Sequence, residues 1–144
     1  MKLLIINGPN LNFLGIREKG IYGAESYETL VERLKQKAAD DGIELECYQN
    51  NSEGAIIDRI QQAYYEKVDG IIINPGAYAH YSIAIRDALA SLEVPKIEVH
   101  ISNVYKREEF RHKSVITPVC TGEILGLGVQ GYFLAMDAMK EYVS

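Results

Sequence analysis

The chain has 144 residues, of which 47% are hydrophobic, and this size predicts a single domain over residues 1–144 with a core of its own. The formal net charge is −5 and no basic run occurs, which argues against nucleic acid as a partner. The first apolar run covers only residues 3–6, too short for a signal peptide or a membrane span. We therefore expect a cytoplasmic protein with no membrane partner.

Cys47 and Cys120 lie far apart in the chain and form no CxxC motif. We expect both to be small buried side chains rather than redox groups or metal ligands.

Short apolar runs alternate with amphipathic segments along the chain. Runs such as 71–73 are typical of buried parallel strands, and apolar residues three and four apart after Ser26 are typical of a helix that begins at a hydroxyl cap. The alternating run 43–48 predicts an edge strand. In chain order, the predicted elements are strand 1–7, helix 26–42, strand 43–48, a helix around 56–64 after a turn and possible cap at 50–52, strand 69–74, helix 82–92, strand 95–101, strand 114–119 and helix 124–142.

Strands that alternate with helices pair in parallel through right-handed crossovers. We therefore expect an α/β fold, a three-layer αβα sandwich of the flavodoxin-like type, with a five-stranded parallel sheet of order 2-1-3-4-5. No linker, low-complexity tract or repeat divides the chain.

The stretch 7–23, after the first strand, is the most irregular part of the chain. Glycine, proline and asparagine punctuate it, yet it holds too many apolar residues for simple disorder. Open α/β sheets bind ligands at such strand ends. Arg17 and Tyr22 lie five residues apart in this stretch, and a nearby positive charge favours the phenolate form that a tyrosine needs to act as a base. Tyr22 is one of ten tyrosines, so a packing role is the alternative.

The carboxyl ends of the first, third and fourth strands are predicted to share one edge of the sheet, which brings His80 and His100 together. Glu98, His100 and Ser102 alternate along one strand and so face the same way. A carboxylate beside an imidazole fixes its tautomer and favours its protonated form, which suits a general acid. A structural Glu–His pair is the alternative.

Three other polar features occur near this edge. Asn74 ends a strand with a neutral amide suited to hydroxyl groups, and Arg111 is suited to gripping a carboxylate unless it is merely a helix-end charge. The three histidines have no close spacing, which argues against a metal site.

Residues 126–131 match the GxGxxG pattern of dinucleotide-binding loops. That site requires the first strand–helix turn and an acidic residue about 20 positions further on, and this motif lies too near the end of the chain. We expect its glycines to allow close packing of the last helix against the sheet or another subunit.

Taken together, these motifs resemble type II 3-dehydroquinate dehydratase over essentially the whole chain. Lys19 and Ala79 depart from the pattern, which usually has proline and threonine there. The stretches that carry the resemblance are 7–12, 15–18 with 22–23, 74–78, His80, 85–89, 98–103, 109–112 and 126–132.

The resemblance implies an anti elimination of water from 3-dehydroquinate through an enolate, giving 3-dehydroshikimate in the shikimate pathway to chorismate and the aromatic amino acids. It implies Tyr22 as base, Arg17 as its activator, and His100 as acid, oriented by Glu98. It also implies a homododecamer, a tetramer of trimers, without metal or organic cofactor. The substrate-binding residues that it implies are Asn10, Asn74, His80, Ile101, Ser102, Arg111 and, from a neighbouring subunit, Asp87.

Two other classes share the predicted fold. A flavin-binding module would need a Ser/Thr-rich phosphate cradle after the first strand, which this chain lacks, and it has no tryptophan. A response regulator would need an acidic cluster and a phosphoacceptor aspartate, whereas the first and third strands end in Asn7 and Asn74.

Overall fold

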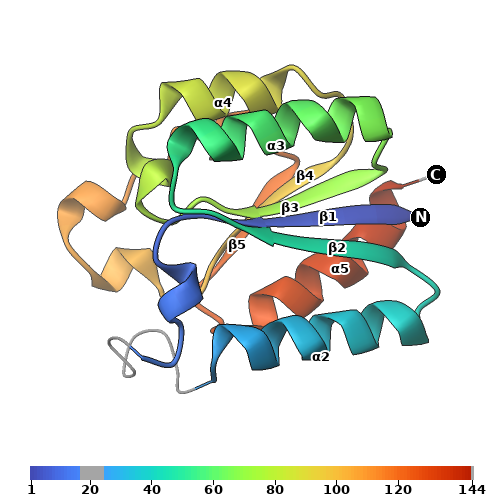
Figure 1. The fold of residues 1–144 in the computed structure, drawn as a ribbon. Helices are drawn as coiled ribbons and strands as arrows, with labels where there is room; N and C mark the ends of the chain where they lie inside the picture. The colour runs from blue at the N-terminus through green and yellow to red at the C-terminus, as the bar shows by residue number, and fades with distance from the viewer. Residues whose placement is uncertain (17–24, 144) are drawn as a thin grey trace.

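The structure is a computed structural model that describes residues 1–16 and 25–143, and it has the predicted α/β architecture. All pairings in the sheet are parallel and the order is β2-β1-β3-β4-β5, with the predicted edge strand β2 at one side (Figure 1). The strands are β1 (Lys2–Asn7), β2 (Glu44–Gln49), β3 (Gly70–Asn74), β4 (Lys96–His100) and β5 (Gly122–Leu125), and the helices are α2 (Tyr27–Asp40), α3 (Glu53–Glu66), α4 (Ile83–Ala90) and α5 (Gln130–Tyr142).

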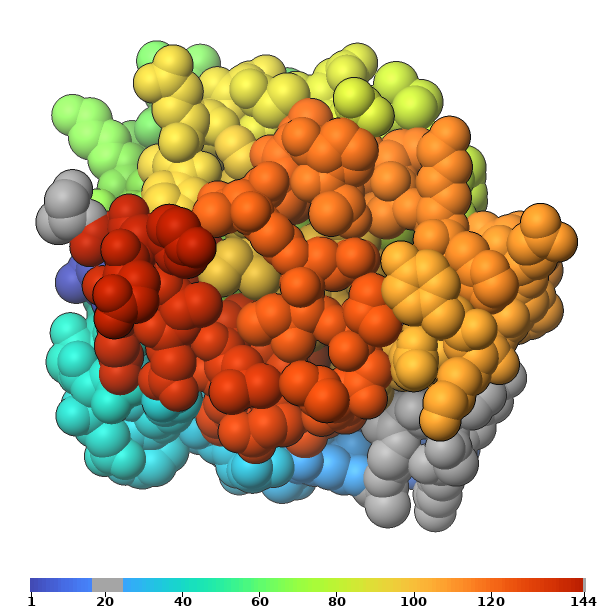
Figure 2. All heavy atoms as spheres, turned by 180° about the vertical axis from the view of Figure 1, so that it is seen from behind, coloured from blue at the N-terminus to red at the C-terminus, as the bar shows by residue number. Residues whose placement is uncertain are grey.

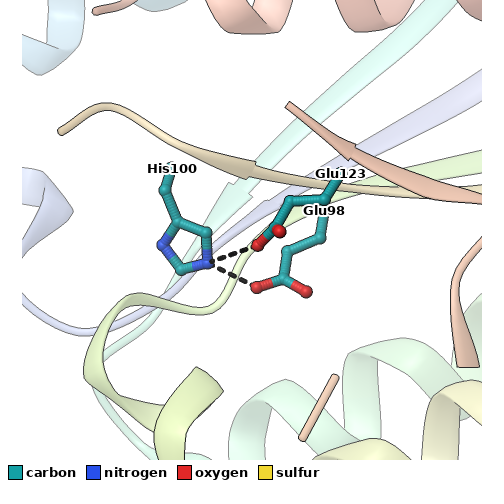
Figure 3. A group of neighbouring side chains, drawn as sticks. All are labelled: Glu98, His100 and Glu123. Carbon is teal, nitrogen blue, oxygen red and sulfur yellow. Dashed lines mark hydrogen bonds and ion pairs between the residues drawn. The ribbon is translucent and has the colours of Figure 1, made fainter. Parts of the chain in front are cut away.

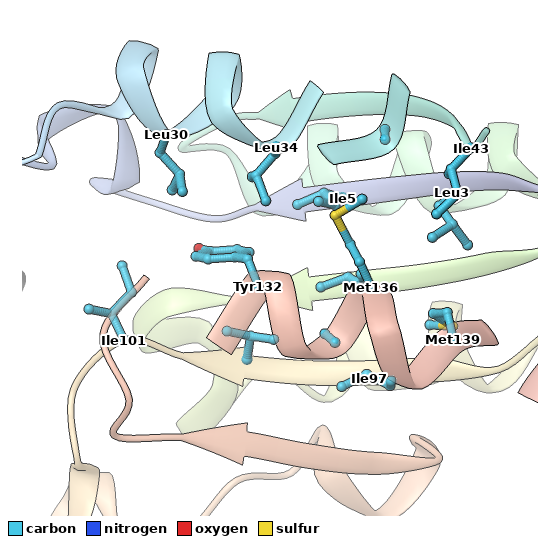
Figure 4. Close-up of a cluster of buried hydrophobic side chains, with 14 of the residues drawn as sticks. Leu3, Ile5, Leu30, Leu34, Ile43, Ile97, Ile101, Tyr132, Met136 and Met139 are labelled. Atoms are coloured by element: carbon cyan, nitrogen blue, oxygen red, sulfur yellow. The ribbon is translucent and has the colours of Figure 1, made fainter. Parts of the chain in front are cut away.

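Helices cover both faces of the sheet, α3 and α4 on one side and α2 and α5 on the other (Figure 1). Because successive side chains of a strand point to opposite faces, Leu4 and Ile6 pack towards α3 and α4, whereas Leu3 and Ile5 pack towards α2 and α5 (Figure 4). All four side chains are at most 1% exposed. Burying each contributes about 1.5–3 kcal/mol, so the central strands anchor both layers.

Serine side chains cap three of the helices. Ser26, Ser52 and Ser82 each accept a hydrogen bond from the backbone N–H three residues further on, at 3.1, 3.3 and 3.1 Å. These bonds satisfy N–H groups that have no partner within the helix, and they set where each helix begins.

The predicted strand 114–119 is wrong. The Ser114 hydroxyl accepts hydrogen bonds from the N–H groups of Ile116 and Thr117, at 3.0 and 3.2 Å, which folds this segment into turns. Residues Thr117–Val119 form a 3₁₀ helix, and Pro118 has no N–H to offer a neighbouring strand. The fifth strand is Gly122–Leu125 instead.

The last helix begins at Gln130, six residues later than predicted. The intervening Gly126 and Gly128 have φ values of 85° and 63°, which side chains rarely adopt. They turn the chain from β5 into α5.

The loops at the carboxyl edge are held close together. The N–H of Gly8, after β1, donates to the carbonyl of Asn74 at the end of β3, at 2.7 Å. A Cβ on Gly8 would lie 2.5 Å from the Pro75 carbonyl oxygen, so only glycine allows this approach. When the molecule is viewed from behind, the irregular chain between β4 and β5, in orange, lies next to α5, in red (Figure 2).

Candidate active site

A cavity of about 170 Å³ opens at the carboxyl edge, between the loops that follow β1, β3 and β4. This is where an open α/β sheet places its ligand. The predicted site residues that line it are Asn10, Asn74, His80, His100, Ile101, Ser102 and Arg111.

Glu98 and His100 form a buried pair on β4, as the strand alternation predicted (Figure 3). The His100 Nε2–H donates to Glu98, whose side chain is fully buried. Two hydroxyls hold the same carboxylate: Ser114 Oγ donates at 2.9–3.0 Å and Thr117 Oγ1 at 2.6 Å. Burial opposes the charge of Glu98, but the hydrogen bonds from His100, Thr117 and Ser114 outweigh it and hold the pKa below its usual range. The carboxylate is therefore ionised and fixes the ring of His100.

The second ring nitrogen of His100, Nδ1, lies on the side of the ring opposite the carboxylates (Figure 3). Because Nε2 carries the hydrogen that Glu98 accepts, Nδ1 is an acceptor in the neutral ring and a donor in the imidazolium. His100 also lines the cavity. Proton exchange with a bound ligand can therefore take place at Nδ1.

Glu123 is a second carboxylate beside His100, and the sequence did not predict it. It lies next to Glu98 in the β4–β5 register, and its Oε2 is 3.8 Å from His100 Nε2 (Figure 3). Burial, and then the charge of Glu98, raise the pKa of Glu123. The three residues bring ligand atoms within 4.8 Å of one another, but both Glu98 oxygens already accept hydrogen bonds from the chain. Locating the fifth strand at 122–125 from the sequence would have revealed Glu123.

His80 lies at the end of the 3₁₀ helix Gly76–His80, and its ring stacks on His100 with the centroids 6.2 Å apart. Its Nδ1–H donates to the carbonyl of Lys113 at 2.8 Å. Burial lowers the pKa of His80. The ring is therefore neutral near pH 7 and leaves Nε2 as an acceptor for a ligand hydroxyl.

Two arginines line the same cavity. Arg111 donates from Nε to Glu108 at 3.0 Å, and its guanidinium lies 5.0 Å from the centre of the Phe110 ring. Arg107, to which the sequence analysis assigned no role, reaches the Ser102 hydroxyl with Nη1 at 3.4 Å. The pair gives the cavity a positive wall suited to a carboxylate.

Arg17 and Tyr22 fall outside the described residues. Asp87 is exposed on α4 and does not line this cavity. The two cysteines are free, half-buried thiols, and burial raises the pKa of Cys47 to about 11 and that of Cys120 to about 12.

The fold and the site define an α/β protein with an oriented histidine–carboxylate pair and cationic side chains in a pocket at the carboxyl edge of a parallel sheet. Dehydroquinase class II is the family whose model matches residues 1–140. The 3-dehydroquinate dehydratase of Lachnoclostridium phytofermentans is 69% identical over 139 residues, covering 96% of each chain. The crystal structure of type II dehydroquinase from Butyrivibrio crossotus is 64% identical, with a TM-score of 0.96 over 97% of each chain. The type II dehydroquinase from Propionibacterium acnes is 45% identical, with a TM-score of 0.94 over 97% of this chain and 96% of that one. The chain belongs to the class II dehydroquinase family.

Within the part of the chain that the structure describes, no helix combines the length and apolar character needed to cross a membrane.

Proposed function

We propose that the chain is a 3-dehydroquinate dehydratase, a hydro-lyase that removes water from 3-dehydroquinate to give 3-dehydroshikimate in the shikimate pathway. Membership of the family supports the reaction. The observation that carries the chemistry is the Glu98–His100 pair, which holds an imidazole against the cavity. A general acid placed in this way assists the departure of a hydroxyl group.

The base in this scheme is the phenolate of Tyr22, with Arg17 favouring its charged form. It removes a proton from the carbon next to the ketone, and the electron pair of the C–H bond forms an enolate. As the enolate collapses to the conjugated ketone, the C–O bond breaks and His100 Nδ1 gives its proton to the leaving oxygen. Water leaves. Tyr22 has gained one proton and His100 has lost one, so the two proton transfers balance.

The remaining side chains bind substrate in this scheme. Arg111 pairs with the carboxylate, while Asn74 and His80 meet the hydroxyls. Asn10 and the backbone N–H groups of Ile101 and Ser102 complete the pocket, and Asp87 reaches it from a neighbouring subunit. The reaction needs only side chains and backbone groups.

We also propose that the enzyme is cytoplasmic and assembles as a homododecamer, a tetramer of trimers. Asp87 supports a shared site because it is exposed and lies away from the cavity of its own chain. Sedimentation velocity distinguishes this assembly from a monomer or a trimer.

The function is tested by incubating the purified protein with 3-dehydroquinate and following the near-ultraviolet absorbance of the conjugated enone. Absorbance that rises in proportion to enzyme is expected, together with a loss of at least about a hundredfold in kcat for His100→Ala. If the folded protein forms no enone, the proposal is contradicted. A yellow protein with a flavin spectrum would favour the flavin-binding class instead.

A further inference from the structure

Tyr132, in the first turn of α5, is 0% exposed among the core side chains (Figure 4). Its hydroxyl makes hydrogen bonds to two asparagines. It donates to Asn7 Oδ1 at 2.5 Å and accepts from Asn74 Nδ2 at 2.9 Å. Asn7 and Asn74 are register partners at the carboxyl ends of β1 and β3. The hydrogen-bonded chain Asn74–Tyr132–Asn7 therefore runs beneath the pocket that Asn74 lines.

The glycine motif at 126–131 explains how a helix brings a tyrosine to this point. A Cβ on Gly131 would lie 3.3 Å from Val99 Cγ1 and 3.5 Å from Ile124 Cγ2, so glycine lets the start of α5 lie directly on β4 and β5. Tyr132 is the next residue, and its side chain lies among the core side chains on the face of the sheet that α2 and α5 cover (Figure 4). The motif thus has a structural use that is independent of dinucleotide binding.

The direction of each hydrogen bond follows from the number of hydrogens available. Burial raises the pKa of Tyr132, so its hydroxyl keeps its one hydrogen, which Asn7 accepts. Tyr132 can then only accept from Asn74, which selects the Nδ2 end of that amide. At the other end, Asn74 Oδ1 accepts from the N–H of Gly76 at 3.1 Å.

A rotation that exchanged Nδ2 and Oδ1 of Asn74 would break both of these hydrogen bonds. The amide nitrogen would then face the Gly76 N–H, and Oδ1 would face a hydroxyl whose hydrogen is already used. One amide hydrogen and one carbonyl lone pair remain for a ligand, in places that the buried chain determines. Asn7 does not line the cavity, and its side chain is held by the Tyr132 hydroxyl, which donates to Oδ1, and by a contact with Tyr27.

We propose that Tyr132 and Asn7 are positioning residues that lock the amide of Asn74 in the orientation that recognises the substrate. This inference rests on the proposed function, since it assigns the recognised group to a hydroxyl of 3-dehydroquinate. It adds two residues that do not line the pocket to those on which the reaction depends.

The test is a double-mutant cycle on kcat/KM with 3-dehydroquinate, using Tyr132→Phe, Asn7→Ala and Asn74→Ala. Tyr132→Phe keeps the ring and removes one oxygen, so we expect a folded protein with kcat/KM lowered about tenfold, the value of one hydrogen bond. Asn7→Ala frees the Tyr132 hydrogen, so the Gly76 N–H is then the remaining contact that selects the Oδ1 end of the Asn74 amide, and a smaller loss of kcat/KM is expected. In the Asn74→Ala background, either change should alter kcat/KM by less than about twofold, because no amide is left to orient.

Tyr48→Phe is the matched control. It also removes a tyrosine hydroxyl, here one on the edge strand β2 that donates to the Ala55 carbonyl at 3.4 Å and makes no bond to Asn74. It should leave kcat/KM within about twofold of the wild type. The positioning role would be overturned if Tyr132→Phe and Asn7→Ala both kept the wild-type value of kcat/KM. It would also be overturned if each change lowered kcat/KM equally in the wild-type and Asn74→Ala backgrounds. A wild-type protein with no turnover would refute the proposed function itself, and the positioning role with it.

Discussion

Replacing Thr117 by valine tests the support that its hydroxyl gives to the Glu98 carboxylate, and the same hydroxyl also bonds Glu123. Valine matches threonine in shape, so packing is kept while the 2.6 Å hydrogen bond to Glu98 Oε1 is lost. The backbone N–H of Thr117 keeps its bond to Ser114. The variant therefore removes one donor from a fully buried carboxylate.

The cost follows from the type of hydrogen bond. Bonds to charged groups contribute about 1.5–3 kcal/mol to stability, and the two Ser114 contacts and His100 continue to hold Glu98. We therefore expect Thr117→Val to lose about 2 kcal/mol in the free energy of unfolding at pH 7. We also expect a fall in kcat, because Glu98 orients the proposed acid.

The pH dependence has a definite sign. Burial opposes the charge of Glu98, but its hydrogen bonds hold the folded-state pKa below that of the unfolded chain. Its contribution to stability is thus present above the unfolded pKa and disappears as the pH falls through the folded pKa. Thr117→Val removes part of this contribution. The difference in the free energy of unfolding between wild type and variant is therefore largest at pH 7 and becomes smaller as the pH falls.

Urea unfolding at a fixed protein concentration, repeated from pH 7 down to pH 3, measures this gap. Thr121→Val is the matched control: it also loses one hydroxyl hydrogen bond, but to the backbone N–H of Lys96 at 3.1 Å on the opposite edge of the sheet. A loss of about 1 kcal/mol that does not vary with pH is expected there. Equal losses in the two variants, or a Thr117→Val gap that is constant with pH, would refute the reasoning.

The other predictions address the proposed mechanism and the close contact between the loops that follow β1 and β3. Tyr22→Phe should lower kcat at least about a hundredfold while a substrate analogue binds as before by calorimetry, and near-normal turnover would remove Tyr22 as the base. Borohydride with 3-dehydroquinate should leave activity intact and add no mass to the protein, because enolate chemistry forms no lysine imine; an inactivating adduct would mean the opposite. Gly8→Ala should lose at least about 1–3 kcal/mol of stability in urea, since its Cβ would meet the Pro75 carbonyl. Gly54→Ala on α3, where a Cβ meets only the Ser52 hydroxyl at 3.8 Å, is its control and should lose nothing.

The sequence by itself determined the strands β1 to β4, the helices α2 to α4 and the order of the sheet. These follow from local causes: apolar periodicity, serine caps, and the short right-handed crossovers that parallel strands require. It also predicted the pairing of Glu98 with His100, because that depends only on the two-residue repeat of a strand.

Only the tertiary structure decided what happens after β4. Ser114 takes part in turns because its hydroxyl reaches Glu98, a residue sixteen positions earlier, and no local pattern records that contact. The fifth strand was therefore misplaced, and with it Glu123, whose meeting with His100 depends on the register of β5. The same holds for Tyr132, which reads as an ordinary helical aromatic residue. Its role depends on bonds to Asn74 and Asn7, which lie 58 and 125 residues away in the chain, and only the packing of α5 on the sheet brings them together.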